Sequence, residues 1–230
     1  MRNRLGKTFL HAYAKQGQKP PRLLIIKRLK KIGKMSDLQA AKQIAKAFHT
    51  ALDDPSQPLK TVLTRHLSAA HLWRGFHPFN EQIGPEALAE TFWQPLRNSL
   101  TSLQRREDIF FAGHHHNETS GVVWVASMGH LMGLFDAPFL GIRPNRRIAM
   151  LRYAEFNKVV DGKIVESALF CDLIHLMNQA GQYPLPPQTG VHLVQPGPAT
   201  QDGLRFDDAD TTEGQNTRDT LQAKIGENYA

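Results

Sequence analysis

Apolar residues recur at helical spacing directly after Met35. Ser36, with Gln39 three residues later, forms a capping box, which is typical of a helix start. The apolar positions that follow are three or four residues apart: Leu38, Ala41, Ile44, Ala45, Phe48 and Leu52. Asp53–Asp54–Pro55 ends this pattern, because a residue that precedes proline disfavours helical geometry. The pattern therefore predicts an amphipathic helix up to that point.

Two further helices are predicted before the middle of the chain. The first covers Leu59–Leu67. Gly84–Pro85 opens the second, because proline fits the first position of a helix. Its apolar positions are Leu88, Phe92, Leu96, Leu100 and Leu103. Pro95 lies inside this pattern, so we expect a kink or a restart there.

After Leu103 the period of the pattern changes from helical spacing to strict alternation. Asp108–Gly113 is predicted to be a strand. A second strand begins at Val122, and its alternate positions share one face: Val122, Trp124, Ala126, Met128, His130 and Met132. Residues 134–146 contain Pro138, Gly141 and Pro144 and are predicted to be a loop.

The last alternating stretch predicts a β-hairpin. Strands Ile148–Val160 and Lys163–Ile174 flank Asp161–Gly162, a pair that favours a two-residue turn. Helices followed by an antiparallel meander indicate an α+β fold, in which the N-terminal helices pack on one face of a curved antiparallel sheet.

Charge divides the chain into parts. Residues 1–34 hold 11 of the 28 Lys and Arg and none of the 21 Asp and Glu, so the rest of the chain is mildly acidic. This basic segment fits an organellar transit peptide, a polybasic surface-binding arm or a translation start placed too far upstream. We expect residues 1–34 to be a disordered or non-native extension, with Met35 as the true start.

The end of the chain changes character again. Five prolines fall within residues 182–198, and residues 203–214 are acidic and polar. Because little here can build a core, residues 185–230 are predicted to be a linker or a loosely attached tail. Residues 35–184 are then the folded domain.

Composition and motifs exclude several classes of protein. A single cysteine, Cys171, excludes a disulfide framework, and no apolar run approaches the ~18 residues of a membrane helix. The chain has no glycine-rich nucleotide loop, P-loop or serine-hydrolase elbow. His114–His115–His116 offers exposed imidazoles without a closed coordination set, so we expect no native metal and no cofactor.

The run DGKIVESALFCDLIHLMNQAG (Asp161–Gly181) resembles the C-terminal signature of SnoaL-type polyketide cyclases. These belong to the nuclear transport factor 2-like superfamily, whose fold is a cone-shaped α+β barrel. Phe76–Leu96 and Leu131–Pro144 also resemble segments of that family, and the likeness covers roughly Met35 to Gly190. The resemblance implies a metal-free enzyme with an aspartate acid/base at the position of Asp172. It also implies a homodimer formed through the open sheet face, and we expect a cytoplasmic location.

The hairpin register argues for the same aspartate. If Asp161–Gly162 are the two turn residues, then Asp172, Phe170 and Ala168 share a face with Leu151, Tyr153 and Glu155. Asp172 and Glu155 would then lie ~13 Å apart along the strands, which allows them to flank a bound molecule. An apolar wall raises the pKa of a carboxyl and makes it a usable acid and base. Asp172 is therefore the predicted catalytic acid/base, and the alternative is an aspartate that ends the strand and caps a following helix.

His130 is the second predicted catalytic residue, as a donor that polarises a substrate oxygen. It fits equally well as a core histidine with a backbone partner. The predicted substrate-binding residues are Tyr153, Glu155, Phe170, Met128, Trp93, His77 and Asn80. The aromatic residues among them also fit a core, and His77 and Asn80 also fit a turn.

Three functions fit these patterns. The first is a cofactor-independent cyclase or isomerase that acts on a hydrophobic carbonyl compound through aspartate acid/base chemistry. The second is a non-catalytic small-molecule-binding or dimerisation domain of the same fold. The third is attachment to nucleic acid or an anionic membrane through residues 1–34, because the folded domain itself lacks a basic character.

Overall fold

The computed structural model describes residues 35–115, 122–186, 197–209 and 212–228. The helices and strands below belong to one unit of the chain, Asp37–Ala230. The predictions for residues 1–34, for His116 and for the proline-rich residues 187–196 lie outside the described residues.

Helices occupy the first part of this unit, as predicted. They are α3 (Asp37–Asp53), α4 (Leu59–His66), α5 (Pro85–Leu88), the π-helical turn η1 (Ala89–Trp93) and α6 (Gln94–Ser99). The predicted restart in the third helix is confirmed by η1, which separates α5 from α6 just before Pro95. The prediction that this helix continues to Leu103 is wrong. Leu100 adopts extended geometry and pairs with Phe135, so the strand begins there.

Six strands form one sheet in the order β2-β1-β6-β5-β4-β3. They are β1 (Leu67–Gly75), β2 (Glu81–Ile83), β3 (Leu100–His114), β4 (Val123–Phe135), β5 (Ile148–Val160) and β6 (Lys163–Cys171). The α+β class is confirmed, with helices packed on one face of a curved six-stranded sheet. The sheet differs from the prediction in three ways: β1 and β2 were not predicted, β1 pairs with β6 in parallel, and the sheet is open, with edges at β2 and β3.

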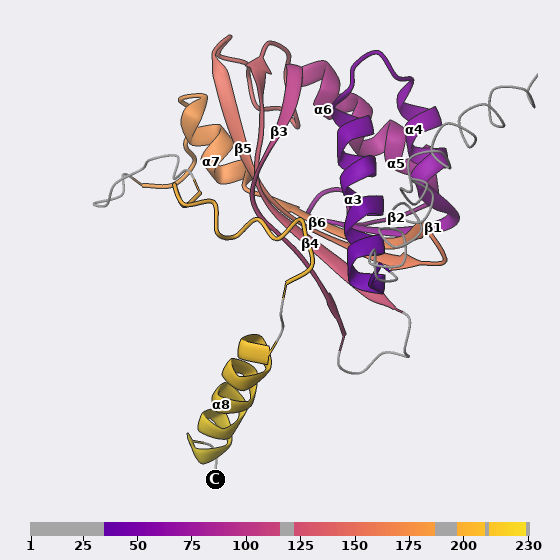
Figure 1. The fold of residues 1–230 in the computed structure, drawn as a ribbon. Helices are drawn as coiled ribbons and strands as arrows, with labels where there is room; N and C mark the ends of the chain where they lie inside the picture. Colours follow the sequence, from indigo (N-terminus) through magenta and orange to yellow (C-terminus); the bar gives the residue numbers. More distant parts are fainter. Residues whose placement is uncertain (1–34, 116–121, 187–196, 210–211, 229–230) are drawn as a thin grey trace, which may run out of the picture. The chain divides into compact units, whose positions relative to one another are not determined.

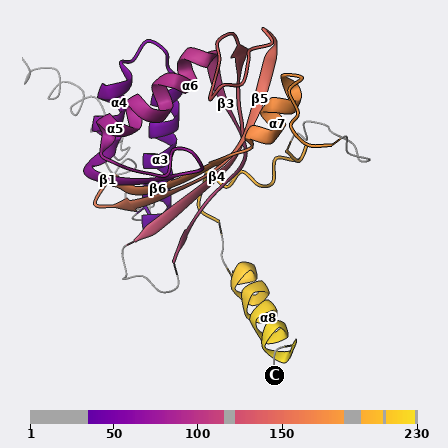
Figure 2. The same ribbon diagram turned by 180° about the vertical axis from the view of Figure 1, so that it is seen from behind.

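Helices α3 to α6 lie on the concave side of the sheet (Figures 1 and 2). The apolar core fills the space between them, with Phe48, Trp73, Phe92 and Phe135 almost completely buried. Each buried aromatic side chain of this size contributes roughly 1.5–3 kcal/mol to folding through burial. The same concave face carries the polar side chains of the candidate site.

A β-bulge in β6 changes the predicted register of the hairpin. Val160 pairs with Lys163 and Val159 with Ile164, as predicted, but Lys158 pairs with Glu166. Val165 is therefore an extra residue, and every residue beyond it turns to the opposite face from the predicted one. Tyr153 consequently pairs with Cys171 and not with Phe170.

Helix α7 (Leu173–Gln179) covers the edge of β5 beyond the end of β6. β6 stops at Cys171, which shortens the predicted strand by three residues. The side-chain amide of Gln179 then takes the place of a neighbouring strand: its oxygen accepts the Met150 N–H and its nitrogen donates to the Met150 carbonyl. Asp172 caps α7: its Oδ1 accepts the backbone N–H of His175 at 2.9 Å.

Part of the predicted tail contacts the domain. Residues 197–209 cross β3, where the Phe110 N–H donates to the Gly203 carbonyl and the Phe110 carbonyl accepts from the Arg205 N–H. The Lys42 ammonium of α3 donates to the carbonyls of Arg205 and Asp207. This part of the chain is thus not a loose tail. Further along, Thr212–Asn228 form a helix, α8, where the sequence predicted a linker.

Candidate functional site

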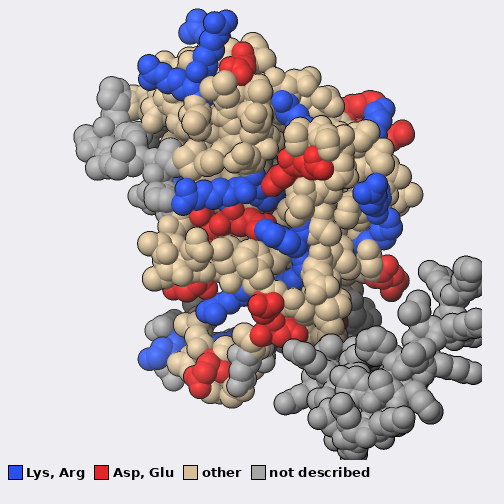
Figure 3. All heavy atoms as spheres, turned by 45° about the horizontal axis from the view of Figure 1, so that its top comes forward, with Lys and Arg blue, Asp and Glu red and all other residues tan. Residues whose placement is uncertain are grey.

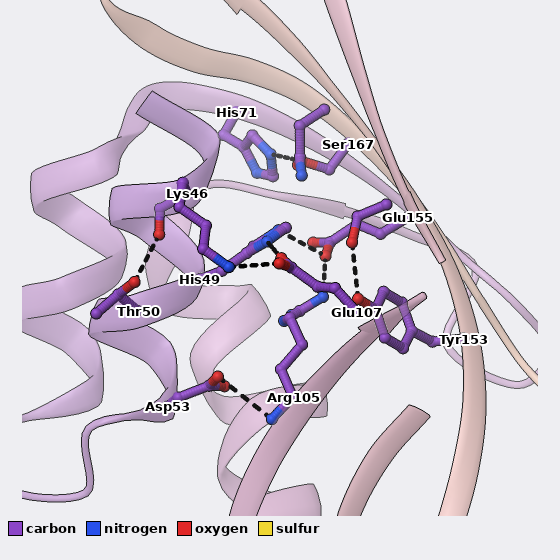
Figure 4. Close-up of polar contacts among 12 residues, drawn as sticks. Lys46, His49, Thr50, Asp53, His71, Arg105, Glu107, Tyr153, Glu155 and Ser167 are labelled. Carbon is purple, nitrogen blue, oxygen red and sulfur yellow. Dashed lines mark hydrogen bonds and ion pairs between the residues drawn. The ribbon is translucent and has the colours of Figure 1, made fainter. Parts of the chain in front are cut away.

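A buried ion pair lies at the centre of the concave face. The Nη1 of Arg105 donates to Oε2 of Glu155 at 2.6 Å, and their side chains are only 1% and 2% exposed. Arg105 comes from β3 and Glu155 from β5, which are separated in the sheet by β4. Figure 4 shows the two side chains pointing toward each other beneath α3.

His49 links this pair to a second carboxylate. Its Nδ1 lies 2.9 Å from Oε1 of Glu107, and its Nε2 lies 3.1 Å from Oε2 of Glu155. Lys46 pairs with the other oxygen of Glu107. Lys46, His49 and Asp53 are spaced three and four residues apart, so α3 presents all three on one face. We refer to Arg105, Glu155, His49, Glu107 and Lys46 as the charge cluster.

Charge compensation fixes the ionisation of the charge cluster. Burial acts to raise the pKa of Glu155, but the positive charge of Arg105 and then His49 outweigh it and hold this pKa at about 2. Burial likewise acts against the Arg105 cation, yet Glu155 keeps its pKa above the ordinary value. Glu155 is therefore a permanent anion at neutral pH and a weak proton acceptor.

Aromatic residues surround the guanidinium group of Arg105. Its carbon lies 4.6 Å from the ring centre of Tyr153 and 6.0 Å from that of Trp93. The Tyr153 hydroxyl is 2.7 Å from the hydroxyl of Ser127. Three predicted substrate-binding residues, Tyr153, Glu155 and Trp93, are thus brought together here, around an arginine that the sequence did not single out.

A separate polar chain lies nearby on the same face. The Ser167 hydroxyl donates to Oδ1 of Asn157 at 2.5 Å, and Nε2 of His71 lies 3.0 Å from the same hydroxyl oxygen. Burial lowers the pKa of His71 to about 4, so this imidazole is neutral at pH 7. Because the single hydroxyl proton goes to Asn157, His71 is the donor to Ser167 and does not activate it as a nucleophile.

The polar atoms of this face are not all paired. Among the described residues, Nε and Nη2 of Arg105, Nδ2 of Asn157 and Nδ1 of His71 are buried without a hydrogen-bond partner. Each such atom costs roughly 1–3 kcal/mol unless water or a ligand contacts it. The concave face therefore has buried hydrogen-bond donors around Arg105 that no described residue accepts.

A cavity of about 590 Å³ opens beside the C-terminal end of α3. Its apolar lining consists of Leu52, Pro55, Pro58, Leu59, Leu100 and Leu103. Its polar lining consists of Asp53, Gln57, Gln94, Arg97, Ser102 and Gln104. We refer to it as the α3 cavity. Its volume falls within the ~300–1,000 Å³ range that is typical of small-molecule sites.

Asp53 connects the α3 cavity to the charge cluster. Its Oδ2 accepts the backbone N–H of Arg105 at 3.3 Å, while the Arg105 side chain reaches Glu155 (Figure 4). Burial raises the pKa of Asp53, and the positive charge of Arg105 only partly opposes this. A cavity-lining carboxyl with a raised pKa has the properties that acid/base catalysis requires.

The expected geometry of Asp172 is wrong. The bulge at Val165 removes Asp172 and Phe170 from the face of Tyr153 and Glu155, and Cys171 takes their place opposite Tyr153. Phe170 is 54% exposed as a result. Asp172 is half-buried and holds the start of α7. Its role as an acid/base stays a prediction.

His130 and the other predicted binding residues also lie away from the charge cluster. His130 and Met128 alternate with Ser127 and therefore point to the convex side of the sheet. His130 is buried there, with Nδ1 3.3 Å from Oδ2 of Asp108. His77 and Asn80 are exposed in the turn between β1 and β2. Their functional roles stay predictions.

Three further findings concern metals, membranes and surface charge. Within the described residues, no three His, Cys, Asp or Glu side chains are grouped so that they could hold a metal ion. No helix in the described part of the chain has the length and apolar character needed to span a membrane. On the face of the domain that Figure 3 shows, basic and acidic side chains are interspersed.

Comparison with solved structures supports the fold. AclR, a candidate hydroxylase from Streptomyces galilaeus, matches with a TM-score of 0.50 and 16% identity over 65% of this chain and 91% of its own. A candidate SnoaL-like polyketide cyclase from Jannaschia sp. CCS1 matches with a TM-score of 0.48 and 19% identity, over 65% and 94% of the two chains. A candidate polyketide cyclase from Xanthomonas campestris pv. campestris matches with a TM-score of 0.49 and 18% identity, over 63% and 99%. No protein-family profile and no curated protein sequence matches the chain.

The sequence pattern did not indicate the most relevant polar residues. Arg105 and Glu107 lie in the charged run QRRED, between the predicted third helix and the predicted strand Asp108–Gly113, and Asp53 lies at the predicted end of a helix. One signal was present: Lys46, His49 and Asp53 interrupt or flank the apolar side of a strongly amphipathic helix. Their partners are more than fifty residues away in the chain, so the pairing itself had no local signature.

Proposed function

We propose that this domain, which has the nuclear transport factor 2-like fold, is a SnoaL-like cyclase or isomerase that uses Asp53 for proton transfer on a hydrophobic carbonyl compound. The observation that carries the proposal is the position of Asp53, a half-buried carboxyl in the wall of the α3 cavity. The resemblance of Asp161–Gly181 to the cyclase signature supports the reaction class.

Asp53 fits proton transfer better than the other carboxyls considered. Burial raises its pKa, which brings it closer to neutral pH and favours both uptake and release of a proton. Glu155, with a pKa of about 2, is held as an anion by Arg105. One oxygen of Asp172 accepts the backbone N–H of His175, much as one oxygen of Asp53 accepts that of Arg105, so this bond does not separate the two carboxyls. Of these three, only Asp53 lines the α3 cavity.

The reaction then follows from ordinary enolate chemistry. The Asp53 carboxylate removes the proton on the carbon next to the substrate carbonyl. The electron pair of that C–H bond forms a carbon–carbon double bond, and the π pair of the carbonyl moves to its oxygen as an enolate. In a cyclisation the enolate carbon attacks a second carbonyl of the same molecule, and the Asp53 carboxylic acid protonates the alkoxide that results. In an isomerisation the Asp53 carboxylic acid instead returns the proton to another carbon of the conjugated system, which shifts the double bond. The Arg105 N–H steadies the carboxylate in its ionised form, and the leucines of the cavity exclude water.

A non-catalytic binding domain is the second candidate, and the charge cluster favours it. Its five side chains compensate one another and fill the middle of the concave face, where the sequence predicted an apolar wall beside a bound molecule. In that case the α3 cavity would bind a ligand without transforming it.

Deuterium exchange separates the two candidates without knowledge of the natural substrate. In D₂O, NMR follows exchange of the acidic protons of 2-tetralone, a hydrophobic enolisable ketone. We expect the wild-type protein to accelerate the exchange and Asp53→Asn to lower the acceleration by roughly 10²-fold or more. Asp54→Asn is the matched control, because Asp54 is adjacent but does not line the cavity.

The Asp172→Asn variant tests the prediction from the sequence in the same assay. Under the present proposal it exchanges protons like wild type. Equal exchange by wild type and Asp53→Asn, with 2-tetralone still bound, would instead support the binding domain. Loss of exchange in Asp172→Asn alone would return the acid/base role to that residue.

A further inference from the structure

Arg97 is the second charged residue of the α3 cavity and is held in a fixed place. It lies in the last turn of α6, and its Nη2 donates to the Leu52 carbonyl, one residue before Asp53. The cavity lining contains two charged residues, Asp53 and Arg97. The guanidinium is therefore anchored to the end of α3, beside the proposed acid/base.

The cation of Arg97 is not neutralised by direct contact. Among the described residues it makes no ion pair within 4.0 Å, although Asp53 and Asp54 act on it from farther away. A guanidinium has five N–H donors, and the bond to Leu52 uses one of them. Arg97 thus offers a planar set of donors to an incoming group.

The remainder of the cavity wall is partly apolar, beside the uncharged polar residues Gln57, Gln94, Ser102 and Gln104. Leu52, Leu59, Leu100 and Leu103 supply most of the hydrophobic lining. Burial lowers the pKa of Arg97, which means that the cation is partly desolvated and gains from a counter-ion. The planar guanidinium can bind the two oxygens of one carboxylate in a bidentate way, and its single positive charge compensates the single negative charge of that group.

We propose that the ligand of the α3 cavity is an apolar ring compound that carries a carboxylate, and that Arg97 binds this carboxylate. The assignment rests on the proposed function for the location of the site, and it adds the chemical class of the ligand. A bound carboxylate beside Asp53 would also oppose ionisation of Asp53, which strengthens it as a proton donor.

Paired probes test the proposal at equilibrium. Binding of 2-naphthoate and of its neutral methyl ester is measured by naphthyl fluorescence at low ionic strength. Wild type should bind the acid roughly tenfold or more tightly than the ester, as expected for a charge-assisted hydrogen bond. Arg97→Met should abolish the preference and leave ester binding within about twofold, and Arg97→Lys should retain part of it.

Arg65→Met is the matched control, because Arg65 is exposed, bonds Gln57 at the cavity and does not itself line it. It should keep the preference for the acid. Equal binding of both probes by wild type, no binding of either, or an unchanged preference in Arg97→Met would overturn the proposal. Thermal unfolding of each variant verifies folding, and Arg97→Lys serves if Arg97→Met does not fold.

The outcome is independent of the catalytic proposal. Asp53→Asn should keep, or increase, the preference for 2-naphthoate, because removal of a neighbouring negative charge favours a bound anion. If Asp53→Asn loses deuterium exchange but wild type does not prefer 2-naphthoate over its ester, only the proposed ligand class is refuted. A carboxylate preference without exchange would refute catalysis alone.

Discussion

Replacing Glu155 with Gln removes one charge from the centre of the charge cluster and preserves the shape of the side chain. Arg105 then stays buried beside a neutral amide, with 1% of its side chain exposed. Removal of one partner of a buried ion pair costs roughly 3–5 kcal/mol, because the other charge is left uncompensated. We therefore expect the free energy of unfolding of Glu155→Gln at pH 7 to fall by about that amount.

The pKa of Glu155, which the same contact with Arg105 lowers, gives a similar magnitude. Its folded value of about 2 lies below the ordinary value of 4.5. A depressed folded pKa stabilises the protein at pH values above the unfolded pKa, here by about 3 kcal/mol at pH 7. This stabilisation is lost as the pH falls toward 2, and roughly half of it should be gone by pH 3. The difference between wild type and Glu155→Gln should therefore shrink over that range.

Urea unfolding at a series of pH values measures both effects. Glu90→Gln is the control, because Glu90 pairs with Lys60 on the surface, where both side chains are more than half exposed. That variant should unfold at nearly the same urea concentration as wild type at pH 7, because solvent screens an exposed pair. A Glu155→Gln protein within ~1 kcal/mol of wild type at pH 7 would refute the argument. So would a difference that stays constant down to pH 3.

Two further predictions concern stability. Asp172→Ala should lower the free energy of unfolding by about 1 kcal/mol, because the cap of α7 is lost. Asp172→Asn should retain most of the stabilisation by the cap. Urea unfolding of both variants measures this difference, and an equal loss in both would contradict the capping role. Phe206→Ala should lower the free energy of unfolding by roughly 1–3 kcal/mol in the same assay. The ring centroids of Phe206 and Phe110 lie 5.2 Å apart, and the Lys46 ammonium lies over the Phe206 ring. An unchanged midpoint for Phe206→Ala would mean that residues 197–209 do not stabilise the domain.

Much of the fold could be predicted because its signals are local. The helix up to Asp53, the restart at Pro95 and the turn at Asp161–Gly162 each depend on neighbouring residues. β1 was missed because its alternation is weak and its buried positions include a histidine, His71. Its position beside β6 depends on a parallel pairing across more than ninety residues, which no local pattern reports.

The candidate site was harder to predict, for a reason that lies in single residues. One extra residue, Val165, turned Asp172 away from Tyr153, and a bulge of this kind leaves no mark in an alternating sequence. A second irregularity lies in β3, between Glu107 and Ile109. Glu107 lies on the concave side of the sheet, whereas Asp108 contacts His130. Faces could therefore be predicted only as far as the nearest bulge.

The charge cluster and the α3 cavity are coupled through one residue, Arg105. The backbone of Arg105 holds Asp53 at the α3 cavity, and its side chain is held by Glu155 at the centre of the concave face. Because Glu155 fixes the side chain of Arg105, the backbone N–H of Arg105 that binds Asp53 is fixed as well. The charge cluster therefore orients the proposed acid/base without contact with a ligand. This explains why a domain of this fold can fill its interior with compensated charge and still present a carboxyl with a raised pKa at its open side. Stability and function would then depend on the same ion pair, and a variant that loosens Arg105 should weaken both.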